Sequence, residues 1–218
     1  MKRILFTAAA AGLTLAAAPV ASADHRPGHQ GGGSGNLTLV ASAKTITFGK
    51  SVTLSGKLTG PNAGARTVTV REDPFPFDNF TDVVTATTDA QGDYSVVRQP
   101  TLNTRYQARS GSEESGIETV LVRPRITLAL SDRTPRSGQR VRFFGRVCPE
   151  HDGRSIAIQR RFGDDWRTVR SAVLTDDGTC SAYSRRIRVR RDGTYRAVLA
   201  ADADHATGVS PRRTANVP

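Results

Sequence analysis

The sequence has 218 residues, a formal net charge of +11 and two cysteines. This length allows two small domains, and two cysteines are too few for a zinc site built from several thiolates. Residues 24–123 carry ten Lys or Arg and ten Asp or Glu, whereas residues 124–218 carry nineteen Arg, no Lys and ten Asp or Glu. The replacement of Lys by Arg in this second half is explained by a GC-rich genome at least as well as by bidentate anion contacts.

The first residues of the chain have the features of a targeting segment. Two cations, a short apolar run and small residues before Ala23 predict a secretory signal peptide over residues 1–23. Residues 24–36 are rich in Gly and lack large apolar side chains, so we expect a flexible leader, in which His25 and His29 are too few to predict a metal site. No later apolar run is long enough to span a membrane. The predicted location is therefore outside the cell, secreted or loosely associated with the cell wall.

The rest of the chain repeats itself with an offset of about 89 residues. The stretch "GKSVTLSGKLTG" lies over "GQRVRFFGRV", and "TTDAQGDYS" over "LTDDGTCSAYS" with a small insertion. At the constant offset, glycines, apolar residues and tyrosines coincide: Gly49 with Gly138, Val52 with Val141, Gly56 with Gly145, Leu58 with Val147, and Tyr106 with Tyr195. We predict two domains of one fold, over residues 37–123 and 124–218.

Apolar and polar residues alternate in short runs throughout both copies, which is typical of strands with one buried face. In the second copy the predicted strands are 126–131, 139–148, 154–161, 166–174, 181–190, 194–201 and 208–217. Turn residues such as Asp152–Gly153 and Asp192–Gly193 separate them. The predicted fold class is all-β, with two tandem immunoglobulin-like β-sandwiches of about seven strands each.

With "IAIQRRFGDDWRTV" and "DGTYRAV", these motifs resemble the tandem bacterial Ig-like repeats of secreted and surface proteins. The segment "TDAQGDYS" also resembles transthyretin-like regulatory modules. The resemblance covers both copies and rests on turn and core residues. It implies a stalk, spacer, adhesive or accessory module without catalytic residues, and such a fold does not by itself define a function.

Arginines occupy the outward positions of two predicted strands that neighbour each other in an Ig-like sheet. The predicted basic face consists of Arg140, Arg142, Arg146, Arg186, Arg188 and Arg190. It is interpreted either as a solvated surface or as a site that attracts anionic polymers. Nucleic acid is a less favoured partner because Phe144 alone on this face offers a ring for base stacking.

Cys148 ends the second predicted strand of the second copy and Cys180 begins the fifth. The up-and-down path of the chain places both at one end of adjacent strands, which predicts a disulfide in an oxidising compartment. A metal site formed by these cysteines with His151 and His205 is the weaker alternative.

The same path brings several acidic loops to that end of the second domain. The candidate Ca²⁺ ligands are Glu150, Asp152, Asp176, Asp177, Asp202 and Asp204. Asp is also common in turns because its side chain caps the local backbone, and this interpretation is favoured. We therefore predict neither a cofactor nor a firm metal site.

In the first copy, the loop "REDPFPFDNFTD" presents Phe75, Phe77 and Phe80. Three phenylalanines in one loop are a candidate contact for a protein or a glycan, and packing against the neighbouring domain explains them equally well. Trp166 is expected to cover the edge of the core, and sugar binding is the less favoured alternative.

No catalytic motif is present: the sequence has no G-x-S-x-G elbow, no phosphate-binding glycine loop and no H-E-x-x-H. We therefore expect a non-enzymatic, exported binding or accessory module that attaches to an anionic polysaccharide, a teichoic-type polymer or a surface protein. The alternatives are a spacer without a specific ligand and a Ca²⁺-dependent adhesive module.

Overall fold

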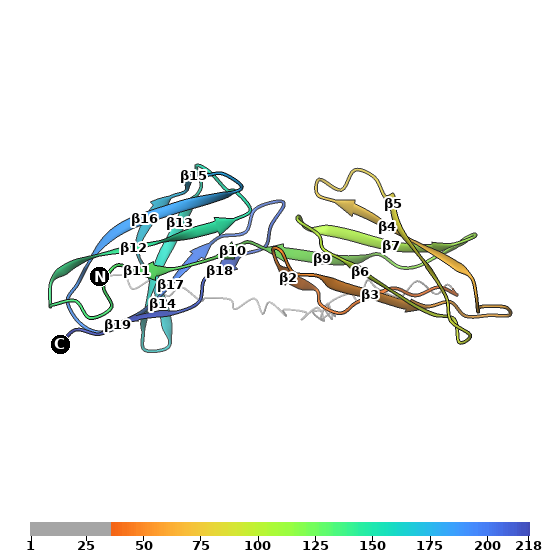
Figure 1. Ribbon diagram of the computed structural model, residues 1–218, viewed down its shortest axis with the longest axis horizontal. Helices are drawn as coiled ribbons and strands as arrows, with labels where there is room; N and C mark the ends of the chain where they lie inside the picture. Colours follow the sequence, from red (N-terminus) through yellow and green to blue (C-terminus); the bar gives the residue numbers. More distant parts are fainter. Residues whose placement is uncertain (1–35) are drawn as a thin grey trace, which may run out of the picture.

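The computed structural model describes residues 36–218, which form two β-sandwich domains placed end to end (Figure 1). The predicted signal peptide and nearly all of the predicted leader lie outside the described residues. Between residues 36 and 218 every regular element is a strand, so the prediction of an all-β chain is confirmed. The described part of the chain accordingly offers no helix that could cross a membrane.

Domain 1 contains two sheets, with the strand orders β1-β3-β6 and β2-β9-β7-β4-β5, and β8 added to β7. Its strands are β1 (Val40–Ala41), β2 (Thr45–Thr47), β3 (Val52–Lys57), β4 (Thr67–Pro74), β5 (Thr81–Thr87), β6 (Asp93–Arg98), β7 (Thr104–Ser110), β8 (Glu113–Glu114) and β9 (Glu118–Arg123). The pairing of β3 with β6 in one sheet, and of β4, β7 and β9 in the other, is the arrangement of strands B, E, C, F and G in immunoglobulin-type domains.

Domain 2 has the same arrangement, with the sheet orders β10-β12-β16-β15 and β14-β13-β17-β18. Its strands are β10 (Arg125–Ile126), β11 (Ala129–Leu130), β12 (Gln139–Cys148), β13 (Ser155–Phe162), β14 (Asp165–Val173), β15 (Thr175–Asp177), β16 (Cys180–Val189), β17 (Gly193–Leu199), β18 (Gly208–Val209) and β19 (Arg213–Ala215). There are more strands than the expected seven because the first and last predicted strands are each divided in two, and β15 is an additional short edge strand.

Each domain has its own hydrophobic core, built from the alternate residues of its strands. Val141 and Phe143 of β12 and Ile187 and Val189 of β16 lie on the inner face of one sheet in the core of domain 2, and all four are buried. The polar residues between them point to the outer face. The alternation read from the sequence therefore gives the correct strand faces.

One glycine in each domain permits the same close contact between strands. A Cβ atom on Gly56 would lie 1.9 Å from the backbone oxygen of Thr38, and one on Gly145 would lie 2.0 Å from that of Thr127. The hydroxyl of a buried tyrosine, Tyr94 or Tyr183, donates a hydrogen bond to this same oxygen in each domain. The first strand can pass this closely only because the glycine has no side chain.

The predicted disulfide between Cys148 and Cys180 is confirmed. It joins the last residue of β12 to the first residue of β16, next to the directly paired Val147 and Ser181. The bond therefore closes the two central strands of one sheet at the end of domain 2 that lies nearest to domain 1.

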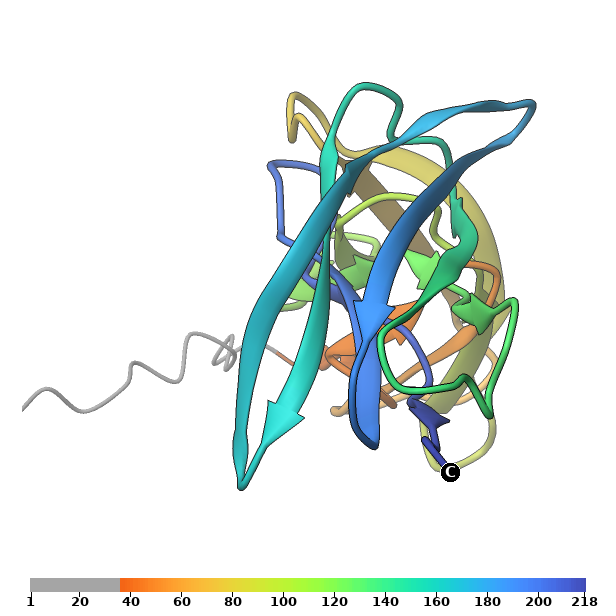
Figure 2. The same ribbon diagram turned by 90° about the vertical axis from the view of Figure 1, so that its left-hand side faces the viewer.

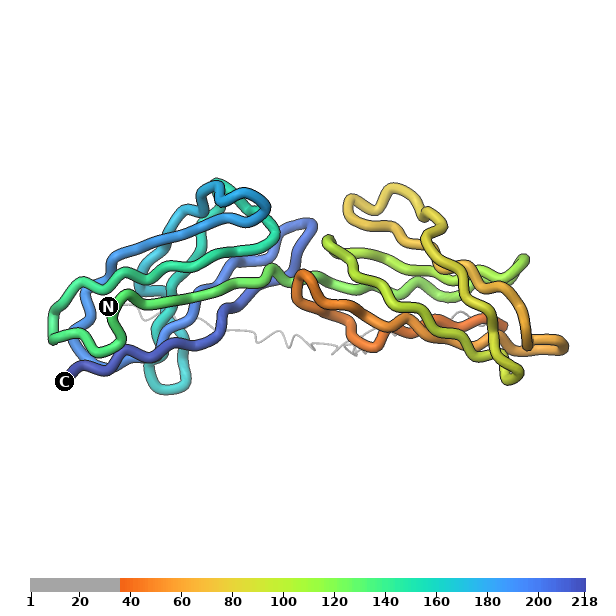
Figure 3. Tube along the Cα trace, viewed as in Figure 1, coloured from red at the N-terminus to blue at the C-terminus, as the bar shows by residue number. Residues whose placement is uncertain are grey.

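The chain crosses once between the domains, through Pro124, and a loop of domain 2 makes further contacts (Figure 3). Loop 200–207 extends toward domain 1, where the backbone N–H of Asn103 donates to the oxygen of Asp204 at 2.8 Å. The N–H of Ala206 donates to the oxygen of Val122 at the same distance. These backbone bonds fix the position of the loop against domain 1.

Candidate functional site

The outer face of the β12–β16 pair carries arginines directly opposite each other. Arg140 pairs in register with Arg188, and Arg142 pairs with Arg186. All four side chains are exposed. Like charges at directly opposite positions destabilise a sheet, so this arrangement does not serve the stability of the domain.

A pocket of about 590 Å³ lies at this face and is lined entirely by arginine. Its six residues are Arg140, Arg170, Arg185, Arg186, Arg188 and Arg190. None of the six has a carboxylate oxygen within 4.0 Å among residues 36–218. Six guanidinium groups without an internal counter-charge make a strongly positive concave surface, which is suited to phosphate or sulfate groups.

Two of the predicted arginines are directed elsewhere. The guanidinium of Arg142 lies 4.3 Å from the centre of the Phe144 ring, and Arg146 forms an ion pair with Asp177. Arg146 also donates a hydrogen bond to the backbone oxygen of Asp177. Both side chains belong to the basic face, but neither lines the pocket.

Two residues of the pocket were missed by the sequence-based prediction. Arg170 lies on β14, which belongs to the other sheet, and Arg185 occupies an inward position of β16, opposite the buried Phe143. The short strand β15 pairs only with residues 180–182 of β16, so the rest of β16 forms an edge of its sheet. This edge contacts β14 of the other sheet (Figure 2). At this open edge Arg185 reaches solvent and meets the arginine from the second sheet.

A second hollow, of about 620 Å³, lies on the same outer face beside the arginine pocket. It is lined by Thr127, Ala129, Arg142, Phe144, Gly145, Arg146, Val173, Thr175, Ala182, Tyr183 and Ser184. Arg142 lines this hollow, and its register partner Arg186 lines the arginine pocket. The hollow and the pocket are therefore adjacent.

The phenylalanine loop of domain 1 lies outside the core clusters, with all three rings half-buried. Phe75 and Phe77 meet edge to face with their ring centres 5.7 Å apart, and Arg105 lies 4.2 Å from the centre of the Phe77 ring. Arg71 lies 5.3 Å from the centre of the Phe80 ring. These cation–π contacts lie within domain 1 itself, and the contact role of the loop remains a prediction.

The six predicted carboxylates do not form one cluster. Asp176 accepts a hydrogen bond from the N–H of Gly178, Asp177 pairs with Arg146, and Asp152 accepts from the hydroxyl of Ser181. These three carboxylates thus act locally, in turns and pairs, as Asp often does. Glu150 is exposed, and only Asp202 and Asp204 lie beside the two histidines.

Trp166 is half-buried and lies outside the core of domain 2, contrary to expectation. Its ring is flanked by the guanidinium groups of Arg196, at 4.2 Å, and Arg212, at 5.5 Å. Burial and the charge of Arg212 lower the pKa of Arg196 from its ordinary value.

No model of a known protein family matches the sequence, and no curated protein matches it. Among solved structures, a marsupial T cell receptor is similar at 12% sequence identity, with 83% of this chain and 72% of that chain covered and a TM-score of 0.36. The strand order described above, not this similarity, is the basis for the Ig-like fold.

Proposed function

We propose that this protein is an exported, non-catalytic module of two tandem Ig-like domains that binds an anionic polymer through the arginine pocket of domain 2. The observation that carries the proposal is a pocket lined by six arginines, none of which pairs with a carboxylate among residues 36–218. Cross-strand arginine pairs reduce the stability of the sheet, and a bound polyanion would remove that repulsion.

The chemistry of the pocket favours phosphate or sulfate groups on a flexible chain. Guanidinium groups bind such oxyanions through paired N–H donors. The pocket itself contains no aromatic side chain on which a base could stack, which disfavours nucleic acid. A teichoic-type polymer or a sulfated or phosphorylated polysaccharide supplies the repeated anionic groups without a need for stacking.

The proposal is tested by removing three charges inside the pocket or three outside it. The pocket variant is Arg140→Gln, Arg186→Gln and Arg188→Gln, and the control is Arg133→Gln, Arg161→Gln and Arg167→Gln, which has the same net charge. Affinity for inorganic polyphosphate and for heparin is measured between about 50 and 200 mM salt. We expect the pocket variant to bind at least about tenfold more weakly and with a shallower salt dependence, because fewer counterions are released.

The control variant distinguishes the pocket from general positive charge. We expect its affinity to change less than about twofold. Equal losses in the two variants would show that binding depends on net charge alone. Absence of salt-dependent binding in the unmodified protein would favour the alternative function, a spacer without a specific ligand.

A further inference from the structure

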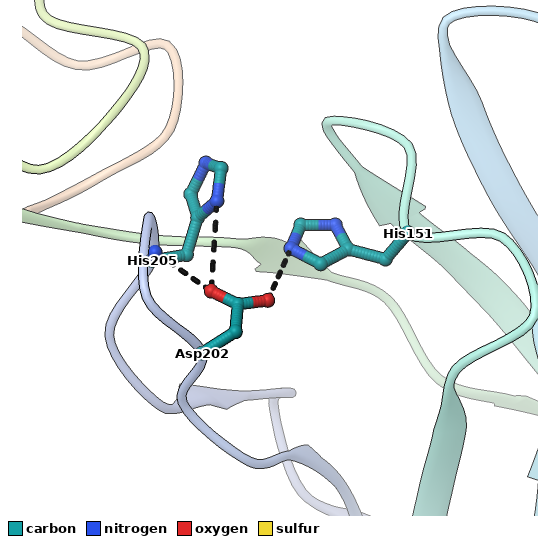
Figure 4. Close-up of side chains that lie close together, drawn as sticks. All are labelled: His151, Asp202 and His205. Atoms are coloured by element: carbon teal, nitrogen blue, oxygen red, sulfur yellow. Dashed lines mark hydrogen bonds and ion pairs between the residues drawn. The ribbon is translucent and has the colours of Figure 1, made fainter. Parts of the chain in front are cut away.

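Two buried histidines face one carboxylate at the junction of the two domains (Figure 4). His151, Asp202 and His205 offer ligand atoms that all lie within 4.8 Å of one another. The side chains of the two histidines are 4% and 3% exposed, and that of Asp202 is 23% exposed. In the part of the chain that the structure describes, this is the one group of three or more such residues with metal-ligand spacing.

The outer nitrogen of each imidazole is hydrogen-bonded to a backbone oxygen. Nδ1 of His151 lies 2.9 Å from the oxygen of Pro149, and Nε2 of His205 lies 3.0 Å from the oxygen of Thr101 in domain 1. A carbonyl oxygen can only accept, so these two nitrogens carry the protons. The lone pairs of a neutral imidazole are then on Nε2 of His151 and Nδ1 of His205, which are the nitrogens nearest to Asp202.

These two inner nitrogens are buried and have no hydrogen-bond partner among the described residues. They lie 3.6 Å and 4.0 Å from the carboxylate oxygens of Asp202. Two lone pairs directed at an anion are unfavourable unless a proton or a cation lies between them.

We propose that His151, Asp202 and His205 bind a divalent transition-metal ion of the zinc type at the domain junction. Two imidazole nitrogens and one carboxylate oxygen are ligands that zinc accepts, with water in the fourth position. The backbone bonds to the outer nitrogens are the second-sphere support that histidine ligands usually have. Calcium is disfavoured because it selects oxygen ligands.

The present spacing requires only a small closure. Tetrahedral zinc with bonds of about 2.0–2.1 Å places its ligands about 3.3 Å apart, so ligand atoms that now lie up to 4.8 Å apart must approach by as much as about 1.5 Å. Rotation of the Asp202 side chain, which is the most exposed of the three, would shorten its distances to the two nitrogens, and the rest of the closure must come from the histidine side chains. Its exposed side also gives the ion a path from solvent.

Neighbouring charges set the affinity. Arg154 forms an ion pair with Asp202, and a carboxylate oxygen of Asp204 lies 3.2 Å from Nδ1 of His205. The guanidinium repels a bound cation, whereas Asp204 attracts it. Loss of the positive charge of Arg154 should therefore strengthen binding.

The bound ion would strengthen the contact between the domains. His205 and Asp202 lie in loop 200–207, and the neighbouring residues Asp204 and Ala206 share backbone hydrogen bonds with domain 1. A ligand bond to His151 ties this loop to the segment that follows the disulfide. Bound zinc would therefore hold loop 200–207, which contacts domain 1, against the rest of domain 2.

The test uses the mature protein with His25→Asn and His29→Asn, which removes the other two of the four histidines. Zn²⁺ is titrated by calorimetry, and Co²⁺ is used for its absorption spectrum. We expect one equivalent to bind, with at least about tenfold weaker binding in His151→Gln, His205→Gln and Asp202→Asn. Asp176→Asn, which removes a carboxylate elsewhere on domain 2, is the matched control and should leave the affinity unchanged.

A gain of affinity provides a second test that misfolding cannot imitate. Arg154→Gln should bind Zn²⁺ at least about threefold more tightly, whereas Arg154→Lys, which keeps the charge, should not. Hydrogen exchange at the amides of Asn103 and Ala206 should slow when Zn²⁺ is added. Unchanged affinity in both histidine variants, or loss of all binding on removal of His25 and His29, would overturn the proposal.

Discussion

The two domains share a strand order but differ on the outer face of the same sheet. At the offset of 89 residues, domain 1 has Ser51, Thr53, Val97 and Gln99 where domain 2 has Arg140, Arg142, Arg186 and Arg188. Both sheets form with the same register, Thr53 opposite Val97 and Arg142 opposite Arg186. The fold therefore does not require the arginines, and their presence in domain 2 needs a separate explanation.

The same comparison explains the origin of the pocket at the edge of domain 2. Val96 of domain 1 faces inward opposite Leu54 and is buried, whereas its equivalent, Arg185, lies opposite Phe143 and is exposed. In domain 2 the ring of Phe143 packs against Tyr195, with ring centres 4.7 Å apart. The inward position at this edge of domain 2 therefore holds a charged side chain that reaches solvent, whereas domain 1 has a buried valine there.

The largest expected difference between the domains comes from the disulfide. Replacing Cys148 and Cys180 by Ser should reduce the free energy of unfolding of domain 2 by roughly 3–4 kcal/mol, because the open chain gains conformational entropy in the unfolded state. Domain 1, which has Thr59 and Gln91 at the equivalent positions, should unfold as before. Urea denaturation with and without reductant measures both transitions. An equal shift of both unfolding transitions would contradict the view that the two domains have independent cores.

A smaller effect, common to both domains, is expected at the close-contact glycines. Gly56→Ala and Gly145→Ala each place a methyl group against a backbone oxygen, which should reduce the free energy of unfolding by about 1–3 kcal/mol. Ser184→Ala, on the exposed part of β16, is the control and should change stability by less than about 0.5 kcal/mol. Thermal unfolding provides the measurement. A neutral glycine variant would show that the first strand moves away without penalty.

The smallest effect on stability is expected from transferring the charges to domain 1. Ser51→Arg, Val97→Arg and Gln99→Arg replace exposed residues, so the fold should lose at most about 1 kcal/mol. Retention on heparin should nevertheless increase and depend on salt, because domain 1 then presents a similar basic face. The same three positions changed to Gln, Gln and Asn serve as the uncharged control. No added retention would mean that Arg170 and Arg185, at the sheet edge, are essential to the site.

Much of the fold follows from local sequence patterns. The run from Gln139 to Val147 puts Val141, Phe143 and Val147 on one side and its arginines on the other, and the observed faces of β12 agree because strand side chains alternate by geometry. The disulfide was predictable because the path of the chain put both cysteines at one end of neighbouring strands. Boundaries were accurate for the long strands β14, β16 and β17, which begin one residue before the predicted positions.

The candidate sites were predictable only in part. Four of the six predicted arginines line the pocket, because the alternation of side chains along the two strands puts them on one face. The alternation of side chains along a strand could not show that Arg142 lies against Phe144 or that Arg146 pairs with Asp177. Those contacts depend on the neighbours that each side chain meets. Nor could the alternation find Arg170, which reaches the pocket from the other sheet.

By itself, the sequence determined the strands, the face of each residue, the excess of positive charge in domain 2 and the pairing of its cysteines. These features depend on alternation and on short-range order along the chain. Tertiary structure alone decided which arginines converge at the open edge. It also decided which of the acidic and histidine side chains at one end of domain 2 meet, namely His151, Asp202 and His205. Such meetings depend on how two sheets pack and how a loop docks on the next domain, and no local pattern encodes either.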